Sequence, residues 1–183
     1  MDTKAGLRAH HIAQRAALRE ADREAWSAAL CAHLGRFCRE RRITRLGAFW
    51  PFGAEVDLRP AVAAHPDFRW FFPRVISTVP PRLAWGTEPL EKGLWGLMEP
   101  SLAQHALPPV QLLLVPGLAF DEKGCRLGYG RGFFDALLAD LPKDILTLGT
   151  GFDLQMRQIV PVEPHDWPVQ GFLSERGIRW LTE

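Results

Sequence analysis

A short, almost continuously apolar run at residues 110–115, VQLLLV, constrains the fold of this chain more than any other feature. Its leucine and valine side chains lie on both sides of an extended strand, so neither side can face water. Strands of this kind belong to parallel sheets that helices cover on both faces. Shorter apolar or aromatic runs predict further strands at residues 46–51, 68–72, 82–85 and 145–149, the second of them ending at Pro73.

Three segments have the composition and spacing of helices. Residues 3–41 are rich in alanine, leucine, arginine and glutamate and repeat apolar side chains at intervals of three and four. Asp22 is expected to cap a second helix, which would divide this segment near residues 19–22. Residues 58–64 and 133–141 predict two shorter helices, the first with a proline in its first turn.

The order of these elements predicts the class of fold. Strands and helices alternate along the chain, which is typical of an α/β protein. We expect one domain over residues 1–183, with a layered, mostly parallel sheet flanked by helices and preceded by an N-terminal helical segment. Residues 73–110 are rich in proline and glycine and predict a long irregular excursion.

Composition narrows the classes of function. With 22 Lys and Arg against 21 Asp and Glu, the chain lacks the basic excess of nucleic-acid-binding proteins. No apolar run reaches the ~18–20 residues of a membrane span, and the N-terminus lacks the apolar core of a secretion signal. Cys31, Cys38 and Cys125 include no C-x-x-C pair, which disfavours disulfides and a zinc ribbon. We therefore expect a cytoplasmic protein that binds a small molecule and neither nucleic acid nor membrane.

Residues 115–135, VPGLAFDEKGCRLGYGRGFFD, carry the strongest chemical signal. They follow the apolar strand, and ligands of parallel sheets bind at the carboxyl ends of strands. Glycines let a backbone with exposed N–H groups approach an anion, and Arg126 and Arg131 add positive charge. Asp121 and Asp135 offer the oxygen ligands that Mg²⁺ prefers. The spacing matches neither the P-loop nor the dinucleotide-binding motif, so a glycine-rich turn with solvated arginines stays open at this point.

The same residues resemble a known family. PGLAFDEKGCRLGYGRGFFD is similar to the signature of 5-formyltetrahydrofolate cyclo-ligases, PG-x-AFD followed by G-x-RLG-x-G-x-GYYD. The similarity continues through K-x-x-x-R near the N-terminus, FWPFGAEVDLRP, FFPRV, GLWGLMEP and FDLQMRQIVPVEPHDWPVQGFLSE. The chain departs from the family where Phe133 and Phe134 replace two tyrosines, which leaves Tyr129 as its one tyrosine.

The resemblance implies a reaction. ATP and 5-formyltetrahydrofolate would give 5,10-methenyltetrahydrofolate, ADP and phosphate, with Mg²⁺ as the metal cofactor. The formyl oxygen would be phosphorylated, N10 of the folate would attack the formyl carbon, and phosphate would leave. We expect a monomer whose partner is the folate substrate.

The resemblance also implies roles for individual residues. Arg126, Arg131 and Tyr129 are expected to be catalytic, and Asp135 and Asp166 to bind the metal. The residues expected at the nucleotide are Lys4, Arg8, Arg126, Leu127, Gly128, Tyr129, Gly130, Arg131, Gly132, Phe133 and Phe134. Those expected at the folate are Trp50, Glu55, Arg74, Trp95 and Tyr129, with Glu99 nearby.

Two other classes of function stay open. The chain could be a non-catalytic relative that binds folate or nucleotide without turnover. It could also be a sugar-phosphate isomerase or CoA-transferase on a similar sheet, although the RLG-x-G-x-G run is not required by those chemistries.

Overall fold

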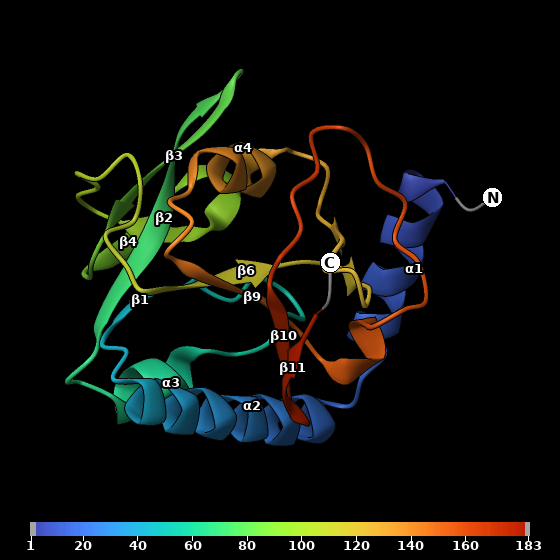
Figure 1. Ribbon diagram of the computed structural model, residues 1–183, viewed down its shortest axis with the longest axis horizontal. Helices are drawn as coiled ribbons and strands as arrows, with labels where there is room; N and C mark the ends of the chain where they lie inside the picture. The colour runs from blue at the N-terminus through green and yellow to red at the C-terminus, as the bar shows by residue number, and fades with distance from the viewer. Residues whose placement is uncertain (1–2, 182–183) are drawn as a thin grey trace.

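The computed structural model of the chain describes residues 3–181. Its centre is a seven-stranded sheet in the order β11-β10-β9-β6-β1-β2-β3 (Figure 1). The strands are β1 (Arg45–Gly47), β2 (Arg69–Thr78), β3 (Pro81–Gly86), β6 (Leu112–Pro116), β9 (Leu146–Thr150), β10 (Gly171–Ser174) and β11 (Gly177–Trp180). The five from β10 to β2 run parallel, and the two edge strands are antiparallel to their neighbours. The expected mostly parallel α/β sheet is therefore confirmed.

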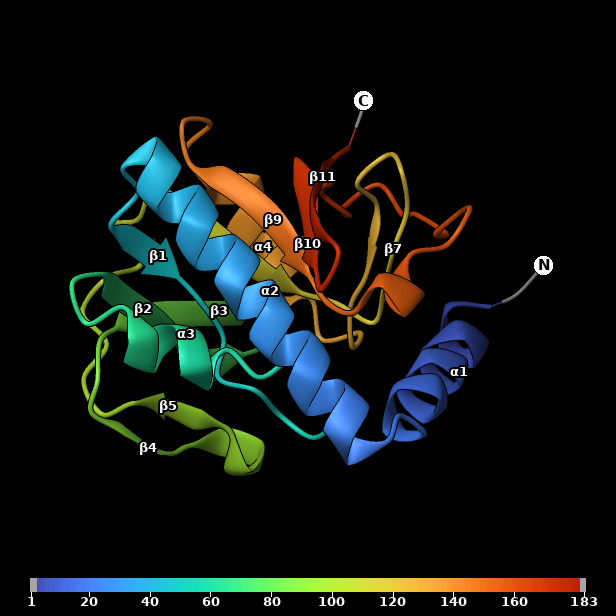
Figure 2. The same cartoon turned by 90° about the horizontal axis from the view of Figure 1, so that it is seen from below.

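The apolar run forms β6, the central strand, and it is buried on both faces as predicted. Leu112 and Leu114 belong to one hydrophobic cluster, whereas Leu113 and Val115 belong to another. The first cluster lies under α2 (Glu20–Arg41) and α3 (Arg59–Ala64), and the second lies under α4 (Phe133–Asp140). Figures 1 and 2 show α2 and α3 covering one face of the sheet and α4 the other. Alternate side chains of one strand thus join both halves of the core.

The N-terminal segment divides where it was expected to, into α1 (Lys4–Ala16) and α2. The expected cap is wrong: Arg19 is the N-cap residue of α2 and makes no side-chain capping bond. Asp22 lies in the first turn, where its carboxylate accepts from the Arg19 guanidinium at 2.6 and 2.8 Å. The acid thus supports the helix N-terminus by charge rather than by capping.

Helix α1 lies beside the sheet and not on it (Figure 2). Its Leu7 packs on Leu118, Leu127 and Val160, which form a third, smaller cluster. Leu118 directly precedes β7 (Ala119–Phe120), and Leu127 is the last residue of β8 (Arg126–Leu127), the partner of β7 in a short hairpin. The α1 helix is therefore attached next to the glycine-rich segment.

The expectation that a strand ends at Pro73 is also wrong, since β2 continues to Thr78. Strand β1 reaches no further along β2 than Phe71, so no strand on that side needs an N–H group from Pro73. On the other side Pro73 faces Trp85, whose own N–H donates to the carbonyl of His105 at 2.7 Å. Proline therefore sits at a position of the strand that has no hydrogen bond to lose.

The segment 73–110 is more regular than expected. It contains the end of β2, β3, and a second hairpin made of β4 (Leu90–Lys92), the 3₁₀ turn η1 (Leu94–Gly96) and β5 (Met98–Pro100). The predicted strand at 46–51 is shorter than expected, because only Arg45–Gly47 pairs with its neighbours. The chain after Gly47 leaves the sheet and is free to form one wall of a pocket.

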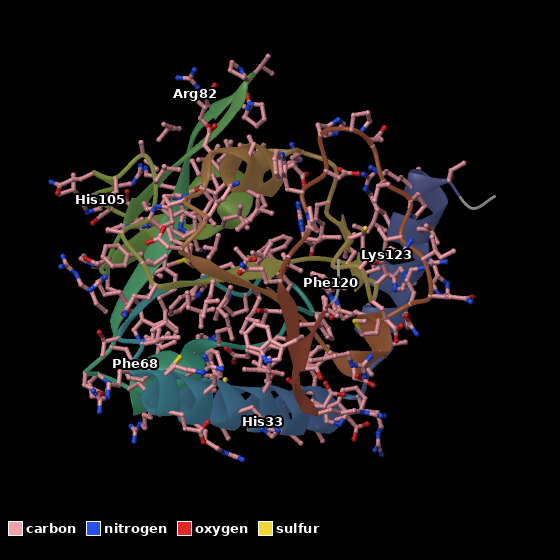
Figure 3. All side chains as sticks on the ribbon, in the orientation of Figure 1. His33, Phe68, Arg82, His105, Phe120 and Lys123 are labelled. Carbon is pink, nitrogen blue, oxygen red and sulfur yellow. The ribbon has the colours of Figure 1, made fainter. Side chains whose placement is uncertain are left out.

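Two smaller features complete the fold. The thiols of Cys31 and Cys38 are buried on α2 and unpaired, as expected of small core side chains, and burial raises the pKa of Cys31 to about 11. Phe68, which Figure 3 labels, follows α3. Its ring stacks on that of His65, with ring centroids 4.7 Å apart. Among residues 3–181, no helix is long and apolar enough to cross a membrane.

Candidate active site

A pocket of about 320 Å³ opens at the carboxyl edge of the parallel strands. The segment that follows β1 lines it, as do the end of β6 and the glycine-rich loop before α4. The β4–β5 hairpin closes another side. The lining residues are Phe49, Trp50, Phe52, Glu55, Pro73, Val75, Leu83, Trp95, Leu97, Met98, Glu99, Pro116, Arg126, Gly128, Tyr129, Gly130, Arg131, Gly132, Phe133, Phe134 and Asp135.

The glycine-rich loop runs along this pocket and into α4. Gly130 and Gly132 have φ of +88° and +73°, a left-handed backbone that glycine adopts without strain. Gly132 is the N-cap of α4 and offers no capping side chain. The first N–H groups of α4 are thus left for a ligand, and a helix N-terminus favours an anion.

Arg8 supports this loop from α1. Its Nε donates to the carbonyl oxygen of Gly128 at 3.0 Å, so the two segments are held together by a charge-assisted hydrogen bond. A Cβ atom added at Gly130 would lie 3.0 Å from the Arg8 guanidinium carbon. The glycine is therefore needed for its backbone angle and also for the close approach of Arg8.

Arg126 and Asp135 form an ion pair in the pocket wall. Arg126 Nη2 lies 2.6 Å from Asp135 Oδ1, and Nη1 donates to the carbonyl of Pro116 at 3.2 Å. The side chains are only 4% and 17% exposed. An expected phosphate-binding residue and an expected metal-binding residue are thus direct partners.

Glu55, Tyr129 and Arg15 form a second polar group. The phenol of Tyr129 donates to Glu55 Oε1 at 2.8 Å and accepts from Arg15 Nη2. The other oxygen of Glu55 accepts from the Phe52 backbone N–H at 2.9 Å. Burial raises the pKa of the Glu55 carboxyl, and the positive charge of Arg15 acts in the opposite direction. Burial and the nearby Glu55 raise the pKa of Tyr129 above its usual value.

Aromatic rings form the remaining wall. Trp50 packs edge-on against Phe72, with ring centroids 5.7 Å apart. The guanidinium of Arg131 lies 3.8 Å from the centre of the Trp95 ring, a cation–π contact between the glycine-rich loop and the β4–β5 hairpin. The Trp95 ring also lies near that of Phe133, with ring centroids 6.1 Å apart.

The structure does not bring Arg74 into the pocket. Side chains alternate along β2, and Pro73 and Val75 line the pocket on either side of it. Arg74 pairs with Glu91 at 2.8 Å and donates to the carbonyl of Pro100 at 2.8 Å. Glu99 lines the pocket instead, buried and accepting from the Val75 N–H at 3.2 Å.

Lys4 and Asp166 also lie outside the pocket lining. Lys4 Nζ is 2.6 Å from both Glu163 and Asp166, so the expected nucleotide and metal ligands bind each other. Burial alone would raise the pKa of Asp166, but hydrogen bonds from Lys4 and the Glu163 N–H lower it overall. Glu163, His165 and Asp166 offer ligand atoms within 4.8 Å of one another, and Lys4 already pairs with both carboxylates.

Two other expected ligands have structural roles. Leu127 is buried against Leu7 and its carbonyl accepts from the Leu118 N–H at 2.7 Å, so it faces the small core and not the pocket. Asp121 accepts from the N–H groups of Lys123, Cys125 and Val160 at 2.9–3.0 Å. The Asp121 carboxylate therefore holds the turn before β8.

The structure brings most of the other expected residues together. The pocket lining includes Trp50, Glu55, Trp95, Arg126, Gly128, Tyr129, Gly130, Arg131, Gly132, Phe133, Phe134 and Asp135. Sequence reasoning missed Phe52, which lines the pocket, and Arg15, which contacts Tyr129. Arg15 is one of two arginines in α1 and belongs to no motif, so only the docking of α1 distinguishes it.

Comparison with known proteins supports a common origin for this arrangement. The model of the 5-formyltetrahydrofolate cyclo-ligase family matches residues 1–175. A 5-formyltetrahydrofolate cyclo-ligase from Haemophilus influenzae is 35% identical over 85 residues, which cover 44% of this chain and 46% of that protein. One from Mycolicibacterium smegmatis is 33% identical over 107 residues, 55% of each chain. The chain therefore spans about half the length of the curated relatives it matches.

A solved structure extends the similarity to nearly the whole chain. The 5,10-methenyltetrahydrofolate synthetase of Aquifex aeolicus superposes with a TM-score of 0.84 at 28% identity, covering 98% of this chain and 93% of that one. The family match includes the pocket, the glycine-rich loop and both flanking helices. The chain belongs to the 5-formyltetrahydrofolate cyclo-ligase family.

Proposed function

We propose that this protein catalyses the ATP- and Mg²⁺-dependent cyclisation of 5-formyltetrahydrofolate to 5,10-methenyltetrahydrofolate. One observation carries the proposal: a single pocket joins an aromatic wall to a glycine-rich loop with two arginines and an aspartate. The aromatic part suits a pterin ring, and the loop suits the phosphates of a nucleotide. The two reactants would then meet within one cavity.

The chemistry requires activation of an unreactive group. An N-formyl group is an amide, so its carbonyl carbon is a weak electrophile and its oxygen a poor leaving group. Transfer of the γ-phosphoryl group of ATP to the formyl oxygen releases ADP. N10 then attacks the formyl carbon and loses its proton to water, the carbon–oxygen bond breaks, and the oxygen leaves with phosphate. Enzymes support such a transfer mainly by positioning and charge stabilisation.

The loop residues are proposed to hold the phosphates. Arg126 and Arg131 supply fixed positive charge at the pocket wall, and Gly128, Gly130 and Gly132 let the backbone approach closely. Arg8 keeps the loop in place through the Gly128 carbonyl. Lys4, whose ammonium pairs with Glu163 and Asp166, would reach a nucleotide only after leaving that pair.

The donor set fits Mg²⁺ at Asp135. One carboxylate oxygen of Asp135 is bonded to Arg126, and its second oxygen can serve a cation in the pocket. Proteins often hold Mg²⁺ through one or two carboxylates, with phosphate and water as its other ligands. When bound, Mg²⁺ would neutralise charge on the transferring phosphoryl group. Asp166 is a second candidate ligand once its pair with Lys4 opens.

The folate is proposed to lie between Trp50 and Trp95. Glu55 would accept hydrogen bonds from N–H groups of the pterin, and Tyr129 would keep its carboxylate turned toward the ring. We propose that a monomer is the active form.

A direct assay tests this function. Purified protein is mixed with 5-formyltetrahydrofolate and Mg²⁺, with and without ATP, and the ultraviolet absorbance of the methenyl product is followed. We expect the absorbance of the methenyl product to increase only when ATP is present. Arg131→Ala is expected to slow this increase, and Arg82→Ala is not. Arg82 is an exposed arginine on β3, outside the pocket lining (Figure 3).

The same assay distinguishes the other classes of function. Folate or ATP binding without product, measured by calorimetry, would indicate a non-catalytic relative. Failure to bind either compound would contradict the proposal and leave the isomerase and CoA-transferase classes.

A further inference from the structure

A chain of side-chain contacts links three segments that are distant in the sequence. Arg15 lies in the last turn of α1, Tyr129 in the glycine-rich loop, and Glu55 in the segment after β1. The guanidinium of Arg15 donates to the phenol oxygen, and the phenol donates to Glu55 Oε1 at 2.8 Å. The contacts therefore run from a helix outside the sheet to the pterin end of the pocket.

The donor and acceptor roles in this chain are fixed by chemistry. A guanidinium has no acceptor, so the hydroxyl hydrogen of Tyr129 cannot point at Arg15 and must point at Glu55. The second oxygen of Glu55 accepts from the Phe52 N–H at 2.9 Å. Both carboxylate oxygens are thereby oriented, and the plane of the carboxylate is set before any substrate binds.

Arg15 is unusual because its guanidinium is buried. It is 5% exposed, and burial of a guanidinium is costly unless a negative charge compensates for it. Its described hydrogen bond goes to a neutral phenol, and Glu55, on the far side of that phenol, is a negative charge with which it interacts. Arg15 and Glu55 thus act as an ion pair with Tyr129 between them.

We propose that Arg15 is a positioning residue, which acts through Tyr129 to hold the carboxylate of Glu55 ionised and oriented for the folate. The proposal rests on the proposed function, in which Glu55 contacts the pterin. The charged and titratable groups that face Glu55 are Arg15 from α1 and Tyr129 from the loop. Arg126 and Arg131 line the same pocket.

The consequence is a dependence on pH. Burial raises the pKa of Glu55 and the charge of Arg15 opposes that rise. Removal of the charge leaves burial uncompensated, so the carboxylate becomes protonated at a higher pH. The acid limb of kcat/KM for the folate then moves to higher pH, and binding at neutral pH weakens.

The single tyrosine permits a test that does not depend on activity. The chain has one tyrosine, so protein labelled with ¹³C at the tyrosine Cζ gives one resonance. Its chemical shift is followed as a function of pH, because it reports the ionisation of the neighbouring Glu55 carboxyl. Glu55→Gln is expected to abolish this titration, which assigns it to the carboxylate.

The variants at position 15 then decide the proposal. Arg15→Met is expected to raise the midpoint of the Glu55 titration by about one pH unit or more. An opposite charge close to a carboxyl group changes its pKa by that amount. Arg15→Lys keeps the charge and is expected to stay close to the wild-type midpoint. An unchanged midpoint in folded Arg15→Met would overturn the proposal, whatever the enzyme assay shows.

Kinetics separate a positioning role from a merely structural one. Arg15→Met is expected to raise KM for the folate about tenfold, the size of one lost hydrogen bond to a charged group, with little change in KM for ATP. Arg36→Met, at an exposed arginine on α2, serves as the control and should leave both constants unchanged. An equal rise in both constants, with no shift of the pH profile, would indicate a structural role and contradict the proposal.

If Arg15→Met fails to fold, Tyr129→Phe tests the same link. This variant removes the phenol oxygen and leaves both charges in place. Tyr129→Phe is expected to raise KM for the folate and to move the acid limb of kcat/KM to higher pH. A wild-type pH profile would refute the proposal that Tyr129 links Arg15 to Glu55.

Discussion

Arg126 Nη2 lies 2.6 Å from Asp135 Oδ1, and this buried pair joins β8 to the first turn of α4. Both side chains line the pocket, where they are proposed to meet phosphate and Mg²⁺. The pair holds each group in place before substrates arrive, so little reorganisation is needed when charge develops. It also makes the site a part of the folded core.

Arg126→Ala is therefore expected to affect both turnover and stability. Loss of the guanidinium leaves the Asp135 carboxylate unpaired in a nearly buried position, which costs about 3 kcal/mol of unfolding free energy. Turnover should fall at least about tenfold, the effect of removing one charge-stabilising donor. Methenyl product formation and urea unfolding measure the two effects.

A conservative variant sharpens this prediction. Arg126→Lys keeps the charge but cannot donate to both Asp135 and the Pro116 carbonyl through one planar fork. It should recover part of the stability and little of the activity. Full activity in Arg126→Ala would remove this residue from the mechanism.

Gly130→Ala is expected to weaken ATP binding. An alanine at φ +88° is strained by ~1–2 kcal/mol, and its Cβ would lie 3.0 Å from Arg8 Cζ. The loop must move to relieve this contact, so KM for ATP should rise several-fold. Gly177→Ala is the control, because Gly177 also has a positive φ, +110°, but its nearest neighbour would be 3.8 Å away at a distant turn. Equal ATP constants in the two variants would argue against a nucleotide site in this loop.

Trp95→Ala is expected to raise KM for the folate about fivefold, because a cation–π contact and the stacking surface are lost together. Arg131 lies 3.8 Å from the Trp95 ring, so the variant also frees this arginine and is expected to raise KM for ATP slightly. Trp95→Phe is expected to have a KM for the folate between those of the wild type and Trp95→Ala. Trp180→Ala is the matched control, since Trp180 is 48% exposed and Trp95 41% exposed. If Trp95→Ala kept the wild-type KM for the folate, as Trp180→Ala is expected to do, Trp95 would not contact the substrate.

Lys4→Met is expected to lower thermal stability in a way that depends on pH. The Lys4 ammonium lowers the pKa of Glu163. At Asp166 burial alone would raise the pKa, but Lys4 together with the Glu163 N–H lowers it overall. Carboxylates with a lowered pKa contribute stability above their unfolded pKa of about 4, and this contribution disappears as pH falls through the folded pKa. The difference in Tm between wild type and Lys4→Met should thus be present at pH 6 and vanish near pH 2.

Lys123→Met is the control for that measurement, because Lys123 is exposed on the turn before β8 (Figure 3). A Tm difference at Lys4 that stayed constant down to the lowest pH would contradict the ion-pair explanation. Hydrogen exchange in α1 should show the same pH dependence.

Local patterns were enough to predict much of the fold. The VQLLLV run predicted a strand covered on both faces, and in the structure most of it lies in β6 at the centre of the sheet. The glycines after it predicted a loop whose backbone can approach an anion, and in the structure Gly130 and Gly132 of that loop line the pocket. Predictions were less accurate where a neighbour decides, as at Pro73, whose place in β2 depends on the length of β1 and on His105.

The candidate site, like the fold, was predictable only in part from local patterns. The sequence by itself determined the residue types that can hold phosphate, metal and a pterin, because these are encoded in short motifs. Only the tertiary structure decided which of them share a pocket. Strand alternation turned Arg74 away, Lys4 paired with Asp166, and Leu127 joined the core. The docking of α1 buried Arg15 against Tyr129. Side-chain direction and partner choice depend on contacts between distant segments, and no local spacing contains them.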